Sequence, residues 1–332
     1  MQKITILDKK ILYELDKDGR ASYSKIAKNV GTTAQVVKYH YHKLMDNEII
    51  KNFWAFVDYD KAGYSFFWGY WMRFSGITKE EEREMYEYLN NHMNVPIIMR
   101  CDGYADALIA IIAKDVFQHN EILQEILTKY GRFITLSDIL VGVGFVKFPR
   151  SYLLEKENDG IFHISGGTTQ VVKLSDMDRK IISLLQIDGR MELTKMAEIL
   201  GVSIGFVHKR YKYLREKEVI TKITYTLNHK ELGLKLYRNA FKIKQFNKER
   251  NDELYQYCMR HPNINNYVKV MGQWQIMIDF EVKDRDELRD IIRDIKHKFN
   301  DIIFEVVVNE VYQIDKFTQM AIEYPNLYKP RF

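Results

Sequence analysis

Residues 18–37, DGRASYSKIAKNVGTTAQVV, return 170 positions later as residues 188–207, DGRMELTKMAEILGVSIGFV. The correspondence extends outward without a gap, so that residues 7–63 align with residues 177–233. A period of this length is far longer than that of a solenoid and indicates a duplicated module. The chain is therefore expected to contain two copies of one domain pair.

The composition is that of an ordinary globular protein. The 332 residues are 46% hydrophobic and 29% charged, and their net charge of +5 is only mildly basic. No apolar run reaches the roughly 18 residues that span a bilayer, and the N-terminus lacks the apolar core of a signal peptide. Two cysteines, Cys101 and Cys258, support neither a disulfide framework nor a cysteine-based zinc site. These observations predict a cytoplasmic protein with no membrane partner, no metal and no cofactor.

The first copy opens with apolar residues at helical spacing. Leu7, Ile11, Leu12 and Leu15 form one stripe, and the Asp-Gly-Arg sequence at residues 18–20 is a stop-and-turn signal. The first helix is therefore expected to end just before this turn.

Two further helices are expected after the turn. The second covers residues 23–30, Gly31 permits a tight turn, and the third runs from its N-cap Thr33 to about residue 46. Ser203 is the matching cap in the second copy. Two helices joined in this way form a helix-turn-helix, whose second helix lies in the major groove of DNA.

The third helix of each copy is predicted to bury one face and expose the other. The buried sets are Ala34, Val37, Tyr41 and Leu44 in the first copy and Ile204, Val207, Tyr211 and Leu214 in the second. Residues 203–217 carry five basic residues against one acidic residue, which favours nucleic acid as a partner. A solvated basic helix face is the alternative explanation.

The outward residues are the predicted contacts to double-stranded DNA. Arg210 is the best candidate for a bidentate guanine contact, with Gln35, Tyr39 and His40 as further base contacts. Lysines and Arg215 are expected to bind phosphates. The full set is Thr33, Gln35, Val36, Lys38, Tyr39, His40 and Lys43 in the first copy and Ser203, Phe206, Lys209, Arg210, Lys212 and Arg215 in the second.

A β-rich segment follows each third helix, at residues 51–58 and 221–228. It is expected to form the wing of a winged helix-turn-helix. Three short helices followed by a β-ribbon also occur in protein-interaction modules, which is the alternative to DNA binding.

The rest of each copy has the order of a ferredoxin-like βαββαβ domain. The expected elements are residues 66–74, 78–91, 97–101, 107–113, 116–130 and 134–145 in the first copy, and 236–244, 248–260, 266–271, 275–282, 285–299 and 302–311 in the second. Helices cover only one face of such a sheet, so the other face must pack elsewhere. Residues 66–72, FFWGYWM, are apolar on both sides of the strand and predict sheet-on-sheet association.

This combination resembles the Lrp/AsnC, or feast/famine, family of transcription regulators, in which a winged helix-turn-helix is followed by a β-hinge and a ferredoxin-like (RAM-type) domain. The family's opening Asp matches Asp8 and Asp178, and its recognition-helix Arg matches Arg210 but is replaced by His40 in the first copy. The resemblance implies an α+β fold with two winged helix-turn-helix domains (1–60 and 174–230), two ferredoxin-like effector and dimerisation domains (61–154 and 231–332) and a polar linker (155–173).

The resemblance also implies a small-molecule effector, usually an amino acid, at a Gly-x-x-Asp turn between strands. Gly103, Tyr104 and Asp106 fit this turn, while the second copy keeps Gly272 and has Gln275 in place of the carboxylate. A carboxylate recognises an ammonium group better than an amide does. A plain β-turn capped by Asp106 is the alternative.

The sequence therefore predicts a sequence-specific transcription regulator with two unequal heads, and not an enzyme. The alternatives are an architectural protein that binds DNA without sequence preference, and an enzyme of the same architecture acting like a sirohaem decarboxylase. The two copies are expected to pair either within the chain, as a pseudo-dimer, or between chains, as a homodimer.

Overall fold

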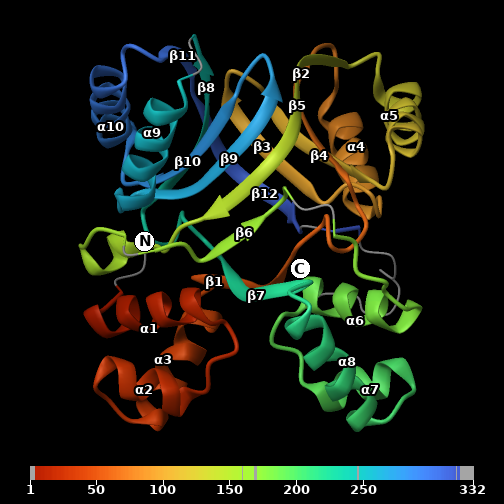
Figure 1. Cartoon of the computed structure of the whole chain (residues 1–332), viewed down its shortest axis with the longest axis vertical. Helices are drawn as coiled ribbons and strands as arrows, with labels where there is room; N and C mark the ends of the chain where they lie inside the picture. Colours follow the sequence, from red (N-terminus) through yellow and green to blue (C-terminus); the bar gives the residue numbers. More distant parts are fainter. Residues whose placement is uncertain (1–3, 159, 168–169, 245–246, 319, 322–332) are drawn as a thin grey trace.

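The structure is a computed structural model that describes residues 4–158, 160–167, 170–244, 247–318 and 320–321. It has three layers (Figure 1). Two helical heads lie side by side at one end, a two-stranded ribbon crosses above them, and two antiparallel sheets with outer helices form the opposite end.

Each head is a three-helix unit. Head 1 comprises α1 (Ile6–Lys17), α2 (Tyr23–Val30) and α3 (Ala34–Asp46), and head 2 comprises α6 (Asp176–Ile187), α7 (Leu193–Leu200) and α8 (Ile204–Glu216). A capping side chain fixes the start of every one of these helices except α7. The turn before α3 is made by Gly31 at φ 75°, a left-handed conformation that a side chain would strain.

The strand after each third helix does not fold into a local wing, contrary to the sequence expectation. β1 (Ile50–Val57) and β7 (Ile220–Leu227) pair with each other in antiparallel register, with Trp54 opposite Thr224. Most of both strands is buried between the heads and the sheets. Their backbone groups therefore need protein partners, and the strand from the other copy supplies them. These two strands are called the ribbon below.

The two ferredoxin-like domains have the expected element order, with one exception in the second. The first comprises β2 (Phe66–Phe74), α4 (Lys79–Asn91), β3 (Ile97–Gly103), β4 (Ala107–Ala113), α5 (Val116–Tyr130) and β5 (Ile134–Lys147). The second comprises β8 (Lys235–Ile243), α9 (Lys248–Arg260), β9 (Ile264–Gly272), β10 (Ile276–Val282), α10 (Arg285–Lys298), β11 (Ile303–Val307) and β12 (Asn309–Phe317). Two strands, β11 and β12, thus take the place of the single strand expected at residues 302–311.

The two sheets join at both edges within one chain. β5 pairs with β9 and β12 pairs with β3, so eight strands close a circuit in the order β10–β9–β5–β2–β4–β3–β12–β8 and back to β10. The faces without helices enclose a shared core in which the rings of Trp71 and Trp274 lie 6.1 Å apart. This closure explains why residues 66–72 are apolar on both sides, and it pairs the two copies inside the chain.

The segment expected to be a polar linker is partly structured. A 3-10 helix, η1 (Ser151–Leu154), precedes it, and β6 (His163–Ser165) extends the sheet by pairing with the end of β5. Its His163 and Ser165 are buried, because the strand passes between β5 and the ribbon residue Phe56, whose ring lies 4.2 Å from that of His163. The segment therefore contributes to the core between the ribbon and the sheet.

No helix in the described ranges is both long and apolar enough to cross a membrane. Cys101 and Cys258 are both buried free thiols.

Candidate nucleic-acid interface

The third helices of both heads expose a polar face to solvent. On α3, Gln35, Lys38 and Tyr39 are exposed, and the Tyr39 side chain reaches 68% exposure. On α8, Lys209 and Lys212 are exposed. Both heads lie on the side of the ribbon that faces away from the sheets, so the two helices are available at the same end of the molecule (Figure 1).

The start of each third helix is capped by a hydroxyl group. The Thr33 Oγ1 accepts a hydrogen bond from the Val36 N–H at 3.3 Å, and the Ser203 Oγ accepts one from the Phe206 N–H at 3.2 Å. Thr33 and Ser203 are exposed and Val36 is partly exposed, so the N-terminal turns are open to solvent. Such termini favour negatively charged groups such as phosphates.

One residue expected in the core of head 2 lies on its surface. Ile204 is 51% exposed, because it is the first residue of α8 and lies beyond the apolar stripe that Val207 and Leu214 bury. Phe206 is 39% exposed beside it. Tyr41 and Tyr211, also expected to be buried, are only partly buried. Head 2 thus presents apolar as well as basic groups.

Arg210 does not point freely outward, contrary to the sequence expectation. Its Nε and a terminal nitrogen donate hydrogen bonds of 2.7 and 2.6 Å to the two carboxylate oxygens of Asp178. In head 1 the Nδ1 of His40 lies 2.6 Å from Asp8 Oδ1. Asp8 and Asp178 are fully buried near the start of the first helix, where each closes a capping box. Each pair therefore ties the third helix of a head to its first.

The hydrogen bonds of Asp178 keep it charged. Burial by itself raises the pKa of the carboxyl, but the hydrogen bonds from Arg210 and Ser175 outweigh that effect, so that the pKa lies below its ordinary range. The pKa of Asp8 is lowered against the same effect of burial, by hydrogen bonds from Thr5 and His40.

Three of the cations expected to bind phosphates also have partners within the protein. Lys43 Nζ lies 3.6 Å from Asp8 Oδ2, Lys212 Nζ lies 3.7 Å from Glu216, and Arg215 donates a 3.0 Å hydrogen bond to the Ile220 carbonyl. The Lys212 pair is exposed and can rearrange at little cost. The Arg215 contact instead joins α8 to the ribbon.

The Asp-Gly-Arg turns do more than end the first helices. Arg20 donates hydrogen bonds to the carbonyls of Gly189 and Met191 at 2.9 and 3.0 Å, and Arg190 donates in return to the carbonyl of Gly19. The turns of the two heads therefore meet each other across the ribbon. The Asp-Gly-Arg sequence is identical in both copies, and this identity was a signal of the contact. Taken alone, the sequence predicts only a helix stop at these residues.

The turn predicted to bind an effector has its polar groups engaged within the protein. Asp106 Oδ2 accepts a 2.7 Å hydrogen bond from the Phe74 N–H. In the second copy Gln275 Oε1 accepts the equivalent bond from Ile243 at 2.8 Å, which explains why the amide can replace the carboxylate. The Tyr104 N–H donates to the Val308 carbonyl at 3.3 Å.

The glycines of these turns are required by the contact between the two copies. Gly103 and Gly272 have φ values of 132° and 135°. A Cβ atom at Gly103 would lie 2.5 Å from the Val308 carbonyl, and one at Gly272 would lie 2.6 Å from the Ile139 carbonyl. Each glycine thus allows close approach of a strand from the other copy.

Comparisons with known proteins agree with this architecture. Residues 174–215 match the AsnC-type helix-turn-helix domain, and residues 4–51 match the winged helix-turn-helix DNA-binding family. The HTH-type transcriptional regulator LrpA of Pyrococcus abyssi is 33% identical over 132 residues, which cover 36% of this chain and 83% of that protein. The HTH-type transcriptional regulator FL11 of Pyrococcus furiosus is 29% identical over 119 residues, which cover 36% of this chain and 78% of that protein.

A likeness over both copies is found with the crystal structure of the siroheme decarboxylase NirDL. It covers 97% of this chain and 96% of that one, with a TM-score of 0.59 and 14% sequence identity. At this identity the likeness concerns the fold. Both helix-turn-helix domains match known families, and the chain is 33% identical to LrpA over 83% of the length of LrpA. The chain therefore belongs to the Lrp/AsnC family of helix-turn-helix transcriptional regulators.

Proposed function

We propose that this protein regulates transcription by binding double-stranded DNA with two non-equivalent heads. The observation that carries the proposal is that α3 and α8 expose polar side chains. Both helices lie at the same end of the molecule, on heads joined by a shared ribbon (Figure 1). The LrpA and FL11 relatives, which are named as transcriptional regulators, support the same function.

The two heads are expected to contact different bases. In head 1 the exposed groups on α3 include Gln35, Lys38 and Tyr39, whereas in head 2 those on α8 include Phe206, Lys209 and Lys212. Amide and basic side chains contact base edges and phosphates, while apolar groups contact thymine methyl groups. A binding site with two unlike halves follows from this difference. Arg210 holds α8 in place through its contact with Asp178, and His40 holds α3 in place through its contact with Asp8.

A selection from genomic DNA fragments, with purified protein at near-physiological salt and sequencing of the bound fraction, tests the proposal. One enriched motif with two unlike halves is the expected result. Gln35→Ala is expected to change preference in one half, and Phe206→Ala in the other. Lys79→Ala, an exposed position on α4 of the first ferredoxin-like domain, is the control and leaves the motif unchanged.

Phosphate contacts are tested by the salt dependence of affinity. Lys209→Ala is expected to weaken binding to all sequences about equally and to reduce the salt slope by about 1. Broad recovery of fragments with no motif, together with a steep salt slope, would instead identify an architectural DNA-binding protein.

The protein is proposed to act by binding and not by catalysis. Release of carbon dioxide from added sirohaem by the purified protein would contradict this part of the proposal. An amino-acid effector at Gly103, Tyr104, Asp106 and Gly272 stays a prediction. Its test is calorimetric titration of the twenty amino acids into wild-type protein and into Asp106→Asn, with loss of binding in the variant as the expected result.

A further inference from the structure

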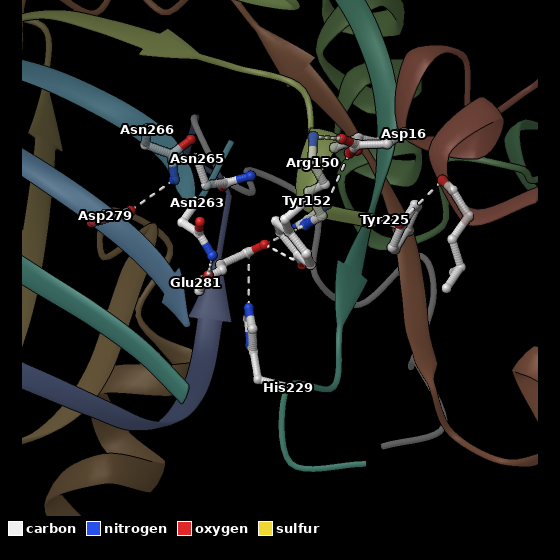
Figure 2. A network of polar contacts seen from close by, with 12 residues as sticks. Asp16, Arg150, Tyr152, Tyr225, His229, Asn263, Asn265, Asn266, Asp279 and Glu281 are labelled. Carbon is white, nitrogen blue, oxygen red and sulfur yellow. Dashed lines mark hydrogen bonds and ion pairs between the residues drawn. The ribbon is translucent and has the colours of Figure 1, made fainter. Parts of the chain in front are cut away.

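A cavity lies between the ribbon and the sheet of the second copy. The empty space there measures about 480 Å³, a value that includes open solvent at the mouth of the cavity. One wall is apolar and includes Trp54 from β1 and Phe317 from β12. Another part of the lining, called the polar wall below, includes Asn265 and Asn266 from β9, next to the buried network that Figure 2 shows.

Three buried polar groups on this lining have no hydrogen-bond partner among the described residues: Trp54 Nε1, Asn265 Nδ2 and Asn266 Oδ1. The three residues are only 4%, 4% and 7% exposed. Buried polar groups are almost always paired, so three orphaned groups around one cavity indicate a missing partner.

The chemistry of the neighbours fixes which atoms of the two amides are free. Asn265 Oδ1 accepts from Lys147 Nζ at 3.3 Å, which leaves its NH2 group as a donor. Asn266 Nδ2 donates to Asp279 at 2.7 Å, which leaves its oxygen as an acceptor. With the indole N–H of Trp54, the lining therefore offers two donors and one acceptor.

The network behind the polar wall has more basic than acidic side chains, although burial lowers the pKa of one basic side chain, Lys222, to about 7. Among the described residues it holds four buried cationic side chains against three buried carboxylates. The cations are Lys147, Arg150, Lys222 and Arg238, and the carboxylates are Asp16, Asp279 and Glu281. Arg150 bridges Asp16 and Glu281 at 2.8 and 3.0 Å (Figure 2). Arg238 pairs with Asp279. Lys147 Nζ lies 3.8 Å from Asp16 Oδ1, the oxygen that also accepts from Arg150.

Burial is the main influence on the pKa of Lys147. Burial, followed by the charge of Arg150, lowers the pKa of its ammonium group to about 8. An additional anion near Asn265 would oppose that shift, because an opposite charge nearby favours the charged form.

The first copy has no such polar wall. In the first copy, Tyr59 stands at the position of His229. By strand register, Gly69, Ile97 and Ala110 stand at the positions of Arg238, Asn266 and Asp279. The charges and amides are therefore not required by the shared fold, since the same architecture is built without them in the other half.

We propose that the cavity between Trp54 and Asn265 binds a small organic carboxylate with an apolar body. The carboxylate accepts the free N–H groups of Trp54 and Asn265 and supplies the negative charge that the network lacks. The apolar body packs against Trp54 and Phe317, and the oxygen of Asn266 accepts from any further donor of the ligand. This site is separate from the turn of Gly103 and Asp106, and its existence does not depend on DNA binding.

The test is calorimetric titration of the full-length protein, without DNA, with isovalerate, phenylacetate and 4-hydroxyphenylacetate, each compared with the alcohol of the same carbon skeleton. At least one acid is expected to bind about tenfold or more tightly than its alcohol, because hydrogen bonds to a charged group are the stronger ones. Near pH 8 binding is also expected to take up protons, seen as a buffer-dependent heat, because the anion raises the pKa of Lys147.

Two variants test the assignment of the donors. Trp54→Phe keeps the aromatic wall and removes one N–H, and it is expected to weaken acid binding about tenfold. Asn265→Asp keeps an oxygen that accepts from Lys147, so the protein is expected to fold. The new carboxylate supplies the missing negative charge and removes the N–H donor of Asn265, so acid binding is expected to be lost. Trp71→Phe is the control, because it removes an orphaned indole N–H that lies away from this cavity.

Three results would overturn the proposal. These are no saturable binding of any of the three acids, equal affinity for acids and alcohols, or acid binding unchanged in both Trp54→Phe and Asn265→Asp. Failure of DNA binding would leave these titrations unaffected, so the two proposals can fail separately.

Discussion

At the scale of single residues, the two heads show how one carboxylate can serve two helices. Asp178 closes the capping box of α6 with Ser175 and also holds Arg210 of α8, 32 residues further along. Asp8 does the same in head 1 with Thr5 and His40. The position of each third helix relative to the first therefore depends on one buried charge.

Arg210→Ala is expected to destabilise the protein by about 1.5–3 kcal/mol, since it removes hydrogen bonds to a buried carboxylate. Urea unfolding measures this change. The control is Lys212→Ala on the same helix, whose exposed pair with Glu216 is worth less than about 0.5 kcal/mol. A stable Arg210→Ala variant with altered base preference would instead make Arg210 a base contact and contradict its positioning role.

The contribution of Asp178 to stability is expected to depend on pH. Its pKa in the folded state lies below the ordinary value of 3.8, so its contribution is complete above that value and is lost as the pH falls further. The difference in unfolding free energy between wild type and Asp178→Asn should therefore be constant from pH 7 to 5 and shrink below about pH 4. A difference that stays constant down to pH 3 would show that folding does not lower the pKa of Asp178, and would contradict this prediction.

At the scale of elements, the turns between first and second helices decide how the heads attach to the ribbon. The N–H of Gly189 donates to the Phe53 carbonyl of β1 at 2.7 Å. The N–H of Gly19 donates to the Ile223 carbonyl of β7 at 2.9 Å. The turns therefore lie against the ribbon backbone with no room for a side chain.

Gly189→Ala is expected to destabilise the protein by about 1–3 kcal/mol, as overpacking of a tight contact does. Its Cβ would lie 2.8 Å from the backbone nitrogen of Trp54. Gly205→Ala in α8 is the matched control, because no atom lies within 4 Å of its added Cβ. It is expected to stabilise the helix by roughly 0.5 kcal/mol. Thermal unfolding is expected to show a lower melting temperature for Gly189→Ala and a slightly higher one for Gly205→Ala. Equal changes in melting temperature would refute the role of the turn.

At the scale of the whole molecule, the buried network joins parts that are distant in the sequence (Figure 2). Arg150 follows β5 of the first copy, Asp16 lies on α1 of head 1, and Glu281 lies on β10 of the second copy. Tyr225 of the ribbon donates a 3.1 Å hydrogen bond to the Leu12 carbonyl of α1. Head 1, the ribbon and the second sheet are thus connected through one set of polar contacts.

Arg150→Ala is expected to cost about 3–5 kcal/mol, because it leaves Asp16 and Glu281 buried without their cation. Arg132→Ala, which breaks an exposed pair with Glu81, is the control and should cost less than about 1 kcal/mol. Urea unfolding of the full chain distinguishes them. Similar losses of unfolding free energy in Arg150→Ala and Arg132→Ala would mean that water replaces Arg150 as the hydrogen-bond donor to the buried carboxylates.

The sequence by itself determined the duplication, the three helices of each head and the βαββαβ order of each sheet domain. Those features depend on caps and apolar spacing within a few residues, such as Thr33 before α3 or the Val37 and Leu44 stripe along it. The family resemblance, drawn from the same residues, was confirmed by the helix-turn-helix matches and by LrpA.

Only the tertiary structure decided that β1 pairs with β7 instead of forming a wing, that the two sheets close a circuit, and that Arg210 binds Asp178. It also decided that Asp16, which the sequence offers as one more charged residue at the end of a helix, lies buried against Arg150 from 134 residues away. The physical reason is that local hydrogen bonds and apolar spacing are set by near neighbours in the chain. The partner of a strand edge or of a buried charge is set by whichever distant segment completes it. For the edges of β1, β5 and β12 that segment belongs to the other copy.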